Sequence, residues 1–519
     1  MRKILPFLFS SLLVVCSTSV AQPVSNPDSA VQAILRGLNG SPLSLQNAKD
    51  HALANAVQVR KAEAAYRAAE GSVRREAGAF DPQLFFNLSH LDQQQPTASF
   101  FAGAPVLSTQ QTTSRSGLRM KLPVGTELEL AMNTSRLATN STFAFLNPEY
   151  DVFGTVSFRQ PLLGGFTVSG RKQLTRAELE LDAEKARYDQ QVIAVSTDVE
   201  HMYWDLYAVE RDFAVQKLTR DRAEAFLNET ELRSRAGLVG PNQIANAKTF
   251  LAQQELLLIE RDEQLDRQSD LLAALIGKRP EGAASRFIAA DEPPGDFPAD
   301  SVDALVERAL KINLDLQAAG RSIDAARATA DAAGWEALPS VNLVGSLGGS
   351  GLGGGSQAVI FGTDTLRISG AGSFGDAVSQ VTRRKFPNWN IGVEVNLPIG
   401  FRTGNGEKER LQAQVLSAQQ SYLEQSRALE EQVRTAYREV LHGKSRIVAA
   451  KAGVEAAQEQ VRIGLIEFHN GRLTAFELVR LGEDFAVAQQ RYSGALVRTA
   501  KAAATLRQLT SGGYPPTSN

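Results

Sequence analysis

The sequence predicts a mainly α-helical protein with a smaller β part, arranged as two copies of one helix–strand–strand–helix unit. Long segments without proline, such as 162–240, carry apolar residues at steps of three and four, as packed helices do. Short segments such as 152–158 alternate apolar and polar residues, as strands do. At 519 residues, the chain is too long to fold around one compact core.

The two copies align over most of the chain. Segment 44–59 matches segment 301–316, and the same register pairs Pro82 with Pro339. Further aligned pairs along the long helices are Tyr203 with Tyr437 and Gly237 with Gly471. Because prolines and glycines agree as well as alanines, duplication explains the match better than chance similarity between alanine-rich helices.

The N-terminus predicts export. Arg2 and Lys3 precede an apolar run that ends in a small-residue cleavage site at 19–21, as in a secretory signal peptide. The alternative is a lipoprotein signal at Cys16, but Val15 stands where a small residue is expected. Cleavage after residue 21 removes the only cysteine, which excludes disulfides and thiolate catalysis. No later apolar run approaches the ~20 residues of a membrane helix, so any membrane span must consist of strands.

These features divide the chain. The predicted parts are a signal peptide at 1–21, an N-terminal segment at 22–43, a first repeat at 44–280, a linker at 281–300, a second repeat at 301–510 and a tail at 511–519.

The longest helices follow a coiled-coil pattern. Apolar positions step by four and three between Tyr188 and Phe213, and again between Leu429 and Ala457. A helix of ~70 residues is about 100 Å long, which no ordinary globular core accommodates. We therefore expect several helices to pack along one seam. Three aromatic residues of this region are interpreted as packing residues: Tyr203, Trp204 and Tyr207.

The predicted strands are one-sided. Segments 84–88, 152–158 and 389–397 place apolar residues on one face, and the repeat aligns Leu84 and Phe86 with Val341 and Leu343 of a fourth segment. Four such strands cannot close a barrel, and open edges are not tolerated in lipid, so several chains must pool their strands if these span a membrane. Alternation at 114–134 predicts a further hairpin that either extends the barrel or projects from its mouth. The glycine-rich segment 345–357 is predicted to be a surface loop, because no helix follows it to complete a phosphate-binding loop.

Charge and motifs exclude several function classes. The formal net charge of −2 gives no reason to expect a nucleic-acid partner. The five histidines occur without an HExxH motif, and the chain contains no GxSxG motif. We therefore predict no catalytic, metal or cofactor site, and no enzyme activity.

With these features, the chain resembles the TolC-like outer-membrane efflux proteins from about residue 44 to residue 509. The resemblance lies in the duplicated order, in "DP" and "LP" before the first strands, and in "QPLLGG" and "LPIGF" after the last ones. It also lies in the helix turns "RAGLVGPNQIANA" and "HNGRLTAFELVRL". The resemblance implies a trimer in the outer membrane of a Gram-negative bacterium. Each chain would give four strands to one twelve-stranded barrel in the lipid, continuous with a long helical tunnel through the periplasm.

The resemblance also implies roles for particular residues. The junction between barrel and tunnel is expected at Pro161, Gly164, Gly165, Pro398 and Gly400. The turns that dock a periplasmic adaptor are expected at Arg235, Gly237, Leu238, Gly471, Arg472 and Leu473. The pore constriction at the periplasmic tip is expected at Glu477, Arg480, Gln243 and Asn246. Arg480 departs from the acidic pattern of the family, which suggests a Glu477–Arg480 lock between neighbouring helices. An ordinary surface pair within one helix is the alternative.

The functional hypothesis is a passive conduit. The chain would be the outer-membrane channel of a tripartite efflux or type I secretion system, with an adaptor and an inner-membrane pump as partners. The linker at 281–300 would cross the waist of the tunnel. The alternative is a secreted or surface coiled-coil protein with a structural or adhesive role.

Overall fold

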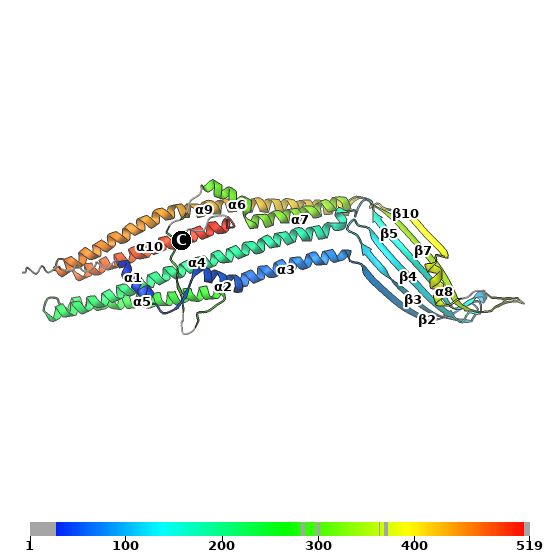
Figure 1. Ribbon diagram of the computed structural model, residues 1–519, viewed down its shortest axis with the longest axis horizontal. Coiled ribbons are helices and arrows are strands. Elements are labelled where there is room, and N and C mark those ends of the chain that lie inside the picture. Colours follow the sequence, from blue (N-terminus) through cyan, green and yellow to red (C-terminus); the bar gives the residue numbers. More distant parts are fainter. Residues whose placement is uncertain are drawn as a thin grey trace, which may run out of the picture.

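The protein is long and narrow, with a bundle of helices at one end and a sheet at the other (Figure 1). The structure is a computed structural model that describes residues 27–281, 286–295, 297, 301–362, 364–367 and 372–512. The predicted signal peptide, part of the linker and most of the tail lie outside the described residues. The mainly α class with a smaller β part is confirmed.

Each repeat begins with a short helix, a break and a longer helix. These are α2 (Leu45–Asn55) and α3 (Val57–Ala77) in the first repeat, and α6 (Val302–Ile312) and α7 (Leu314–Glu336) in the second. Ser44 and Ser301 cap α2 and α6, and each hydroxyl accepts a backbone N–H three residues later at 3.3 Å. The breaks at Ala56 and Asn313 share an extended backbone conformation. The predicted duplication is therefore present in the caps and breaks as well.

Two helices are much longer than the other described helices. They are α4 (Val168–Arg235) and α9 (Arg402–His469), each of 68 residues and therefore about 100 Å long. The helices α5 (Pro241–Ile276) and α10 (Ala475–Leu509) return along them. Val195, Val199 and Leu206 of α4 are buried, as are Val433 and Val440 of α9, which confirms the predicted seam.

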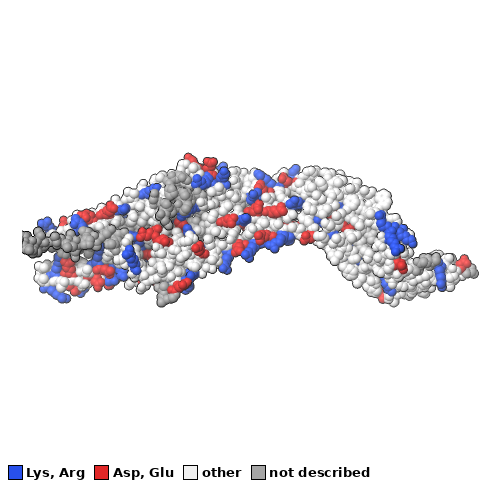
Figure 2. Space-filling view, viewed as in Figure 1, with Lys and Arg blue, Asp and Glu red and all other residues white. Residues whose placement is uncertain are grey.

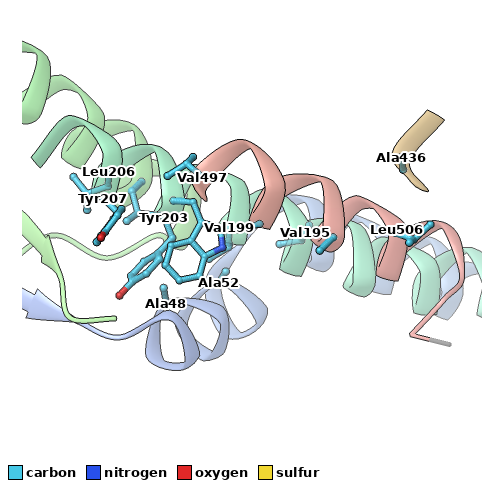
Figure 3. Packing of buried hydrophobic residues seen from close by; sticks show 14 of the residues in the cluster. Ala48, Ala52, Val195, Val199, Tyr203, Leu206, Tyr207, Ala436, Val497 and Leu506 are labelled. Atoms are coloured by element: carbon cyan, nitrogen blue, oxygen red, sulfur yellow. The ribbon is translucent and has the colours of Figure 1, made fainter. Parts of the chain in front are cut away.

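A core near the middle of the bundle joins the two repeats. Strand β1 (Ser41–Leu43) pairs in parallel with β6 (Phe287–Ala289) beside α4. The hydroxyl of Tyr203 lies 2.9 Å from the carbonyl of Leu43 and accepts the N–H of Ala290 at 3.0 Å. Figure 3 shows Tyr203 beside Ala48 and Ala52 of α2, and these residues belong to one buried cluster with Val497 of α10. Tyr203, Trp204 and Tyr207 are buried, so their interpretation as packing residues is confirmed. A further helix, α1 (Pro27–Arg36), packs against α4.

The sheet contains six strands in the order β10-β7-β5-β4-β3-β2, and every neighbouring pair is antiparallel. The strands are β2 (Gln83–Pro96), β3 (Val106–Lys121), β4 (Glu127–Thr139), β5 (Leu146–Pro161), β7 (Ser340–Ser356) and β10 (Phe386–Asn396). Two short 3₁₀ helices lie beside β2: η1 (Gly78–Phe80) and η2 (Phe100–Ala102).

The prediction of four strands per chain is wrong. The predicted hairpin forms β3 and β4, which pair with β2 and β5 on either side and thus lie inside the sheet. Backbone hydrogen bonds on both sides make the hairpin part of the sheet rather than a projection. The total of twelve strands that rested on four per chain therefore does not apply to this protein.

The prediction of a surface loop at 345–357 is also wrong, because this segment lies almost entirely in β7. Beyond β7, the chain forms the hairpin of β8 (Val359–Phe361) and β9 (Asp364–Leu366), followed by the helix α8 (Phe374–Thr382). Helix α8 packs against β7, and a Cβ atom on Gly351 would lie 2.0 Å from the carbonyl oxygen of Ala377. The glycines of β7 therefore provide the close approach that the helix requires.

Candidate functional site

The six-stranded sheet has one apolar face. The outward positions of β10 are Trp389, Ile391, Val393 and Val395, each more than 60% exposed in the single chain. The register continues this face across the sheet through Leu347, Val156, Leu130, Leu118 and Leu84. A continuous apolar surface of this size marks a contact with lipid or with protein. Among the described residues, no helix is both long enough and apolar enough to cross a membrane.

The opposite face of the sheet is polar. Glu394 of β10 forms an ion pair with Arg159 of β5 at 2.9 Å, and Arg115 of β3 pairs with Glu129 of β4 at 2.6 Å. Glu394 and Val395 are consecutive and therefore point to opposite faces. An apolar face and a charged face on one sheet are the arrangement of a barrel with lipid outside and water inside.

The predicted junction residues lie where the sheet meets the helices. Pro161 is the last residue of β5, and Gly165 has a φ of +99° before α4 begins. Pro398 and Gly400 lie between β10 and α9, and Gly400 has a φ of +96°. Glycine adopts such angles readily, so both strands turn into their helices within a few residues. Gly164 lies beside the backbone of α7, where a Cβ atom would be 3.5 Å from the carbonyl oxygen of Trp335.

The turn between β3 and β4 packs against the same junction. A Cβ atom on Gly125 would lie 2.5 Å from the carbonyl oxygen of Gly165, and one on Gly170 would lie 3.1 Å from that of Pro123. The hairpin thus contacts the start of α4. Sequence reasoning found the hairpin but not this contact, since the contact depends on long-range packing.

The two helix turns predicted to dock an adaptor lie at the same end of the molecule, opposite the sheet (Figure 1). Gly237 and Gly471 have φ values of +77° and +71°. In each turn, the N–H of the following residue, Leu238 or Arg472, donates to a helix carbonyl at 2.9 Å. This is the same glycine cap in both repeats. Arg235 is exposed and Leu473 is half-buried.

The predicted constriction residues lie just beyond these turns. Gln243 and Asn246 are exposed on α5, and Glu477 and Arg480 are exposed on α10. Glu477 belongs to a capping box: its carboxylate accepts the N–H and the hydroxyl of Thr474 at 2.8 and 2.7 Å. These hydrogen bonds hold the pKa of Glu477 below its usual value. In the described part of this chain Glu477 uses its carboxylate for the cap, and its ion pair with Arg480 is not formed.

Charged groups at the middle of the bundle were not predicted. Burial would raise the pKa of Glu200, but Arg507 and Lys49 hold it below its usual value, with the Lys49 ammonium 2.7 Å from the carboxylate. Glu210 is buried and accepts the N–H of Ala289 at 2.7 Å, and burial raises its pKa to about 8. The sequence signal was weak because both residues sit in a helix rich in charges. Their contacts link α4 to the second repeat and to the linker.

Comparison with known families agrees with this geometry. The family model of the outer membrane efflux protein matches residues 49–278 and 305–512, which cover both repeats. The chain belongs to the outer membrane efflux protein family. These efflux proteins are outer-membrane channels of Gram-negative bacteria with a helical extension into the periplasm, and they act as passive channels rather than as enzymes. The alternative of a secreted adhesive protein is therefore set aside.

The chain is similar to individual proteins in sequence or in fold. Nodulation protein T of Rhizobium leguminosarum bv. trifolii is 25% identical over 67% of this chain and 69% of its own length. The outer membrane protein VceC of Vibrio cholerae is 16% identical, with a TM-score of 0.62 over 91% of this chain and 97% of its own. The MtrE channel of Neisseria gonorrhoeae is 16% identical, with a TM-score of 0.61 over 92% and 90%.

Proposed function

We propose that three copies of this efflux protein form one passive conduit across the outer membrane and the periplasm. The conduit would serve a tripartite efflux or type I secretion system. Cargo would enter from an inner-membrane pump through a periplasmic adaptor docked at the helix turns. The observation that carries this proposal is a two-faced sheet that continues directly into helices about 100 Å long.

The sheet itself supports the assembly. Its edge strands β2 and β10 each have one neighbour in the described chain, and an open edge is not tolerated in lipid. β2 runs away from the helices and β10 runs toward them. The β2 of one copy can therefore pair with the β10 of the next and continue the antiparallel order.

Six strands per chain give the proposed trimer eighteen strands rather than twelve. Barrel diameter grows roughly linearly with strand number, and barrels of 16–18 strands leave an aqueous channel. The polar face with Glu394 and Arg159 would line this channel. A barrel of this width would not restrict the passage of cargo through the membrane. Selection of cargo would then fall to the helical tip.

The helix turns at the tip support the proposed adaptor docking and the proposed pore constriction. Its two equivalent glycine turns present similar shapes to an adaptor. Glu477 and Arg480 lie a few residues beyond one turn, on an exposed side of α10. We place them at the constriction, near the threefold axis of the proposed trimer.

Cysteine cross-linking tests the arrangement, because Cys16 is the only natural cysteine and lies in the predicted signal peptide. Arg480→Cys leaves the capping box of Glu477 and Thr474 intact, so it is the first probe, and Glu477→Cys is the second. Oxidation should join pairs of protomers at either position and reduce transport, and a reductant should restore transport. Gly482→Cys, about 160° from Arg480 and about 140° from Glu477 around the helix, is the control, and a Cβ atom there meets nothing within 4 Å.

The mass of the detergent-extracted complex completes the test. A trimer is expected. A stable monomer that keeps all its strands would overturn the conduit, whereas an intact trimer without any cross-link at 477 or 480 would remove these residues from the constriction.

A further inference from the structure

We propose that the apolar face of the sheet holds one lipid molecule with an anionic phosphate headgroup. The acyl chain would lie in a hollow of the sheet, and the headgroup would bind the basic cluster Arg383, Arg384 and Lys385. This inference rests on the outer-membrane location of the family and not on the proposed conduit.

The hollow lies between the end of α8 and strands β2 to β7. Its volume is about 570 Å³, and its lining is apolar, with side chains that include Leu84, Leu118, Leu130, Val156 and Leu347. Arg384 is the only charged residue among the described residues that line it. A hollow of this kind suits a hydrocarbon chain with an anionic group at one end.

The basic cluster follows α8 directly, and all three of its side chains are exposed. Figure 2 shows a compact basic patch at this place on a sheet end that is otherwise largely uncharged. Lys385 lies over the ring of Phe386, with its ammonium 5.6 Å from the ring centroid. The one acidic residue of α8, Asp376, caps the other end of the helix through Ser373. The cluster therefore has its positive charge available for an anion.

The position of the cluster fits the surface of a membrane. The end of α8 lies at the level of Gly349 and Gly154, where Val381 contacts both strands. Toward the helical bundle, the outward side chains of β3 and β4 are the apolar Leu118, Met120, Leu128 and Leu130. Away from the bundle, the outward side chains of these two strands include the polar Ser114, Thr112, Thr134 and Arg136. The cluster thus lies at the outer border of the apolar band, where lipid phosphates are found and where Arg and Lys extend along apolar surface toward water.

The orientation also fits. The hollow extends from Arg384 toward Leu84 and Val156, which lie closer to the helical bundle along their strands. A lipid of the outer leaflet has its headgroup away from the periplasm and its chains directed toward it. A lipid with its headgroup at the cluster and its acyl chain in the hollow matches both the direction of the hollow and the orientation of the outer leaflet.

The backbone at Arg384 is a separate indication. Arg384 has a φ of +52°, and its N–H and that of Lys385 donate to the carbonyls of Val381 and Gln380 at 3.0 and 2.9 Å. This is the glycine position of a helix C-cap, where an L-residue is disfavoured. An arginine here indicates a use for its side chain, and its guanidinium suits a phosphate group.

Native mass spectrometry of the intact complex tests the proposal. The complex is extracted in mild detergent and offered phosphatidylglycerol, phosphatidylcholine or inorganic phosphate. We expect retention of phosphatidylglycerol about tenfold above that of phosphatidylcholine, because only the former is net anionic. Inorganic phosphate at millimolar concentration should not displace the lipid, because it lacks the acyl chain. Displacement by inorganic phosphate would reduce the site to an anion site and overturn the proposal.

Two variants separate binding from folding. The triple change Arg383→Gln, Arg384→Gln and Lys385→Gln should lower phosphatidylglycerol retention to the level of phosphatidylcholine. Arg384→Gly should lower retention several-fold while the thermal stability of the complex is kept, since glycine suits the backbone there. The matched control replaces three exposed basic residues of α9, Lys408, Arg427 and Lys451, with Gln and should leave lipid retention unchanged. Full retention by the triple variant, or equal retention of both lipids by the natural protein, would overturn the site.

Discussion

The long helices of the two repeats have equal length, whereas the segments that precede them have diverged. α4 and α9 each contain 68 residues, and both end in a glycine cap. Between α3 and α4 the first repeat has four strands of the six-stranded sheet, but between α7 and α9 the second has two strands of that sheet, the separate β8–β9 hairpin and α8. The same duplication has thus been kept in one region and altered in the other.

The difference teaches where this fold accepts change. Each long helix packs along much of its length against other helices, so an inserted residue would shift many contacts at once. The sheet accepts a hairpin because two added strands keep every neighbour antiparallel and every apolar side chain on its face. The second repeat differs in another way, because helix α8 packs on glycines of β7 at the apolar face of the sheet.

The largest expected effect comes from removing the first repeat's hairpin. Replacement of residues 97–145 by a short loop joins β2 to β5 with the apolar face preserved, since the register keeps Phe86 and Gly154 on one side. In the proposed trimer the barrel should lose six of eighteen strands, and its diameter should fall to about two thirds. End-on electron microscopy of the purified complex would measure this. An unchanged diameter would mean that the hairpin is not part of the barrel wall.

The next prediction concerns the two faces of β10. Val395→Arg places a charge on the apolar face and should cost about 2–4 kcal/mol if the site is near the membrane midplane. Glu394→Gln, one residue away on the polar face, loses only the exposed pair with Arg159 and should cost far less. Heat stability of the complex in detergent would compare the two. Greater damage from Glu394→Gln would reverse the assignment of the faces.

A third prediction uses Glu210, which aligns with Lys444 in the second repeat. Burial raises the pKa of Glu210 to about 8, whereas the unfolded carboxyl titrates near 4.5. The folded state holds this proton to higher pH, so its contribution to stability is full below 4.5 and is lost as the pH rises toward 8. Glu210→Gln should therefore stabilise the protein at pH 9, by an amount on the order of 1–3 kcal/mol, and have little effect at pH 4.

Unfolding in urea at several pH values would test this. The exposed Glu483→Gln is the control for loss of one negative charge and should leave the pH dependence as it is. A Glu210→Gln protein with the same loss of stability between pH 5 and pH 8 would assign that loss to other groups.

The smallest expected effect is at the tip. Gly471→Val forces a β-branched residue into positive φ and should cost about 1 kcal/mol, because nothing else lies within 4 Å of the new Cβ. The trimer should survive while adaptor binding, measured by co-purification, is lost. Gly453→Val is the matched control, since Gly453 lies within α9, also with open space around it. Normal adaptor binding by the Gly471→Val protein would separate docking from the shape of this turn.

The helical part of this fold could be predicted from sequence because its signals are local. Ser44 and Ser301 predict the N-caps of their helices, and apolar residues spaced by three and four predict the helix face that packs in the seam. Pro161 and Gly165 mark the junction for the same reason: proline ends strand pairing and glycine permits the turn.

The strand count could not be predicted in this way. The alternation at 114–134 predicts a hairpin, but its place inside the sheet depends on pairing with both β2 and β5. The glycines of β7 have low strand propensity and read as a loop. They form a strand because α8, more than twenty residues later in the chain, packs onto them. At the tip, the capping box of Glu477 could be predicted because it involves only neighbouring residues of the chain. The distance from Glu477 to another copy depends on the assembly and could not be predicted.

The placement of the hairpin β3–β4 has a consequence for how this family changes over time. Its two strands start and finish at the same border of the sheet, so a chain without them can still pass from β2 to β5 through a short loop. A single gene event of this kind acts three times in a threefold assembly. In the proposed trimer, the number of strands in the barrel would therefore change in steps of six.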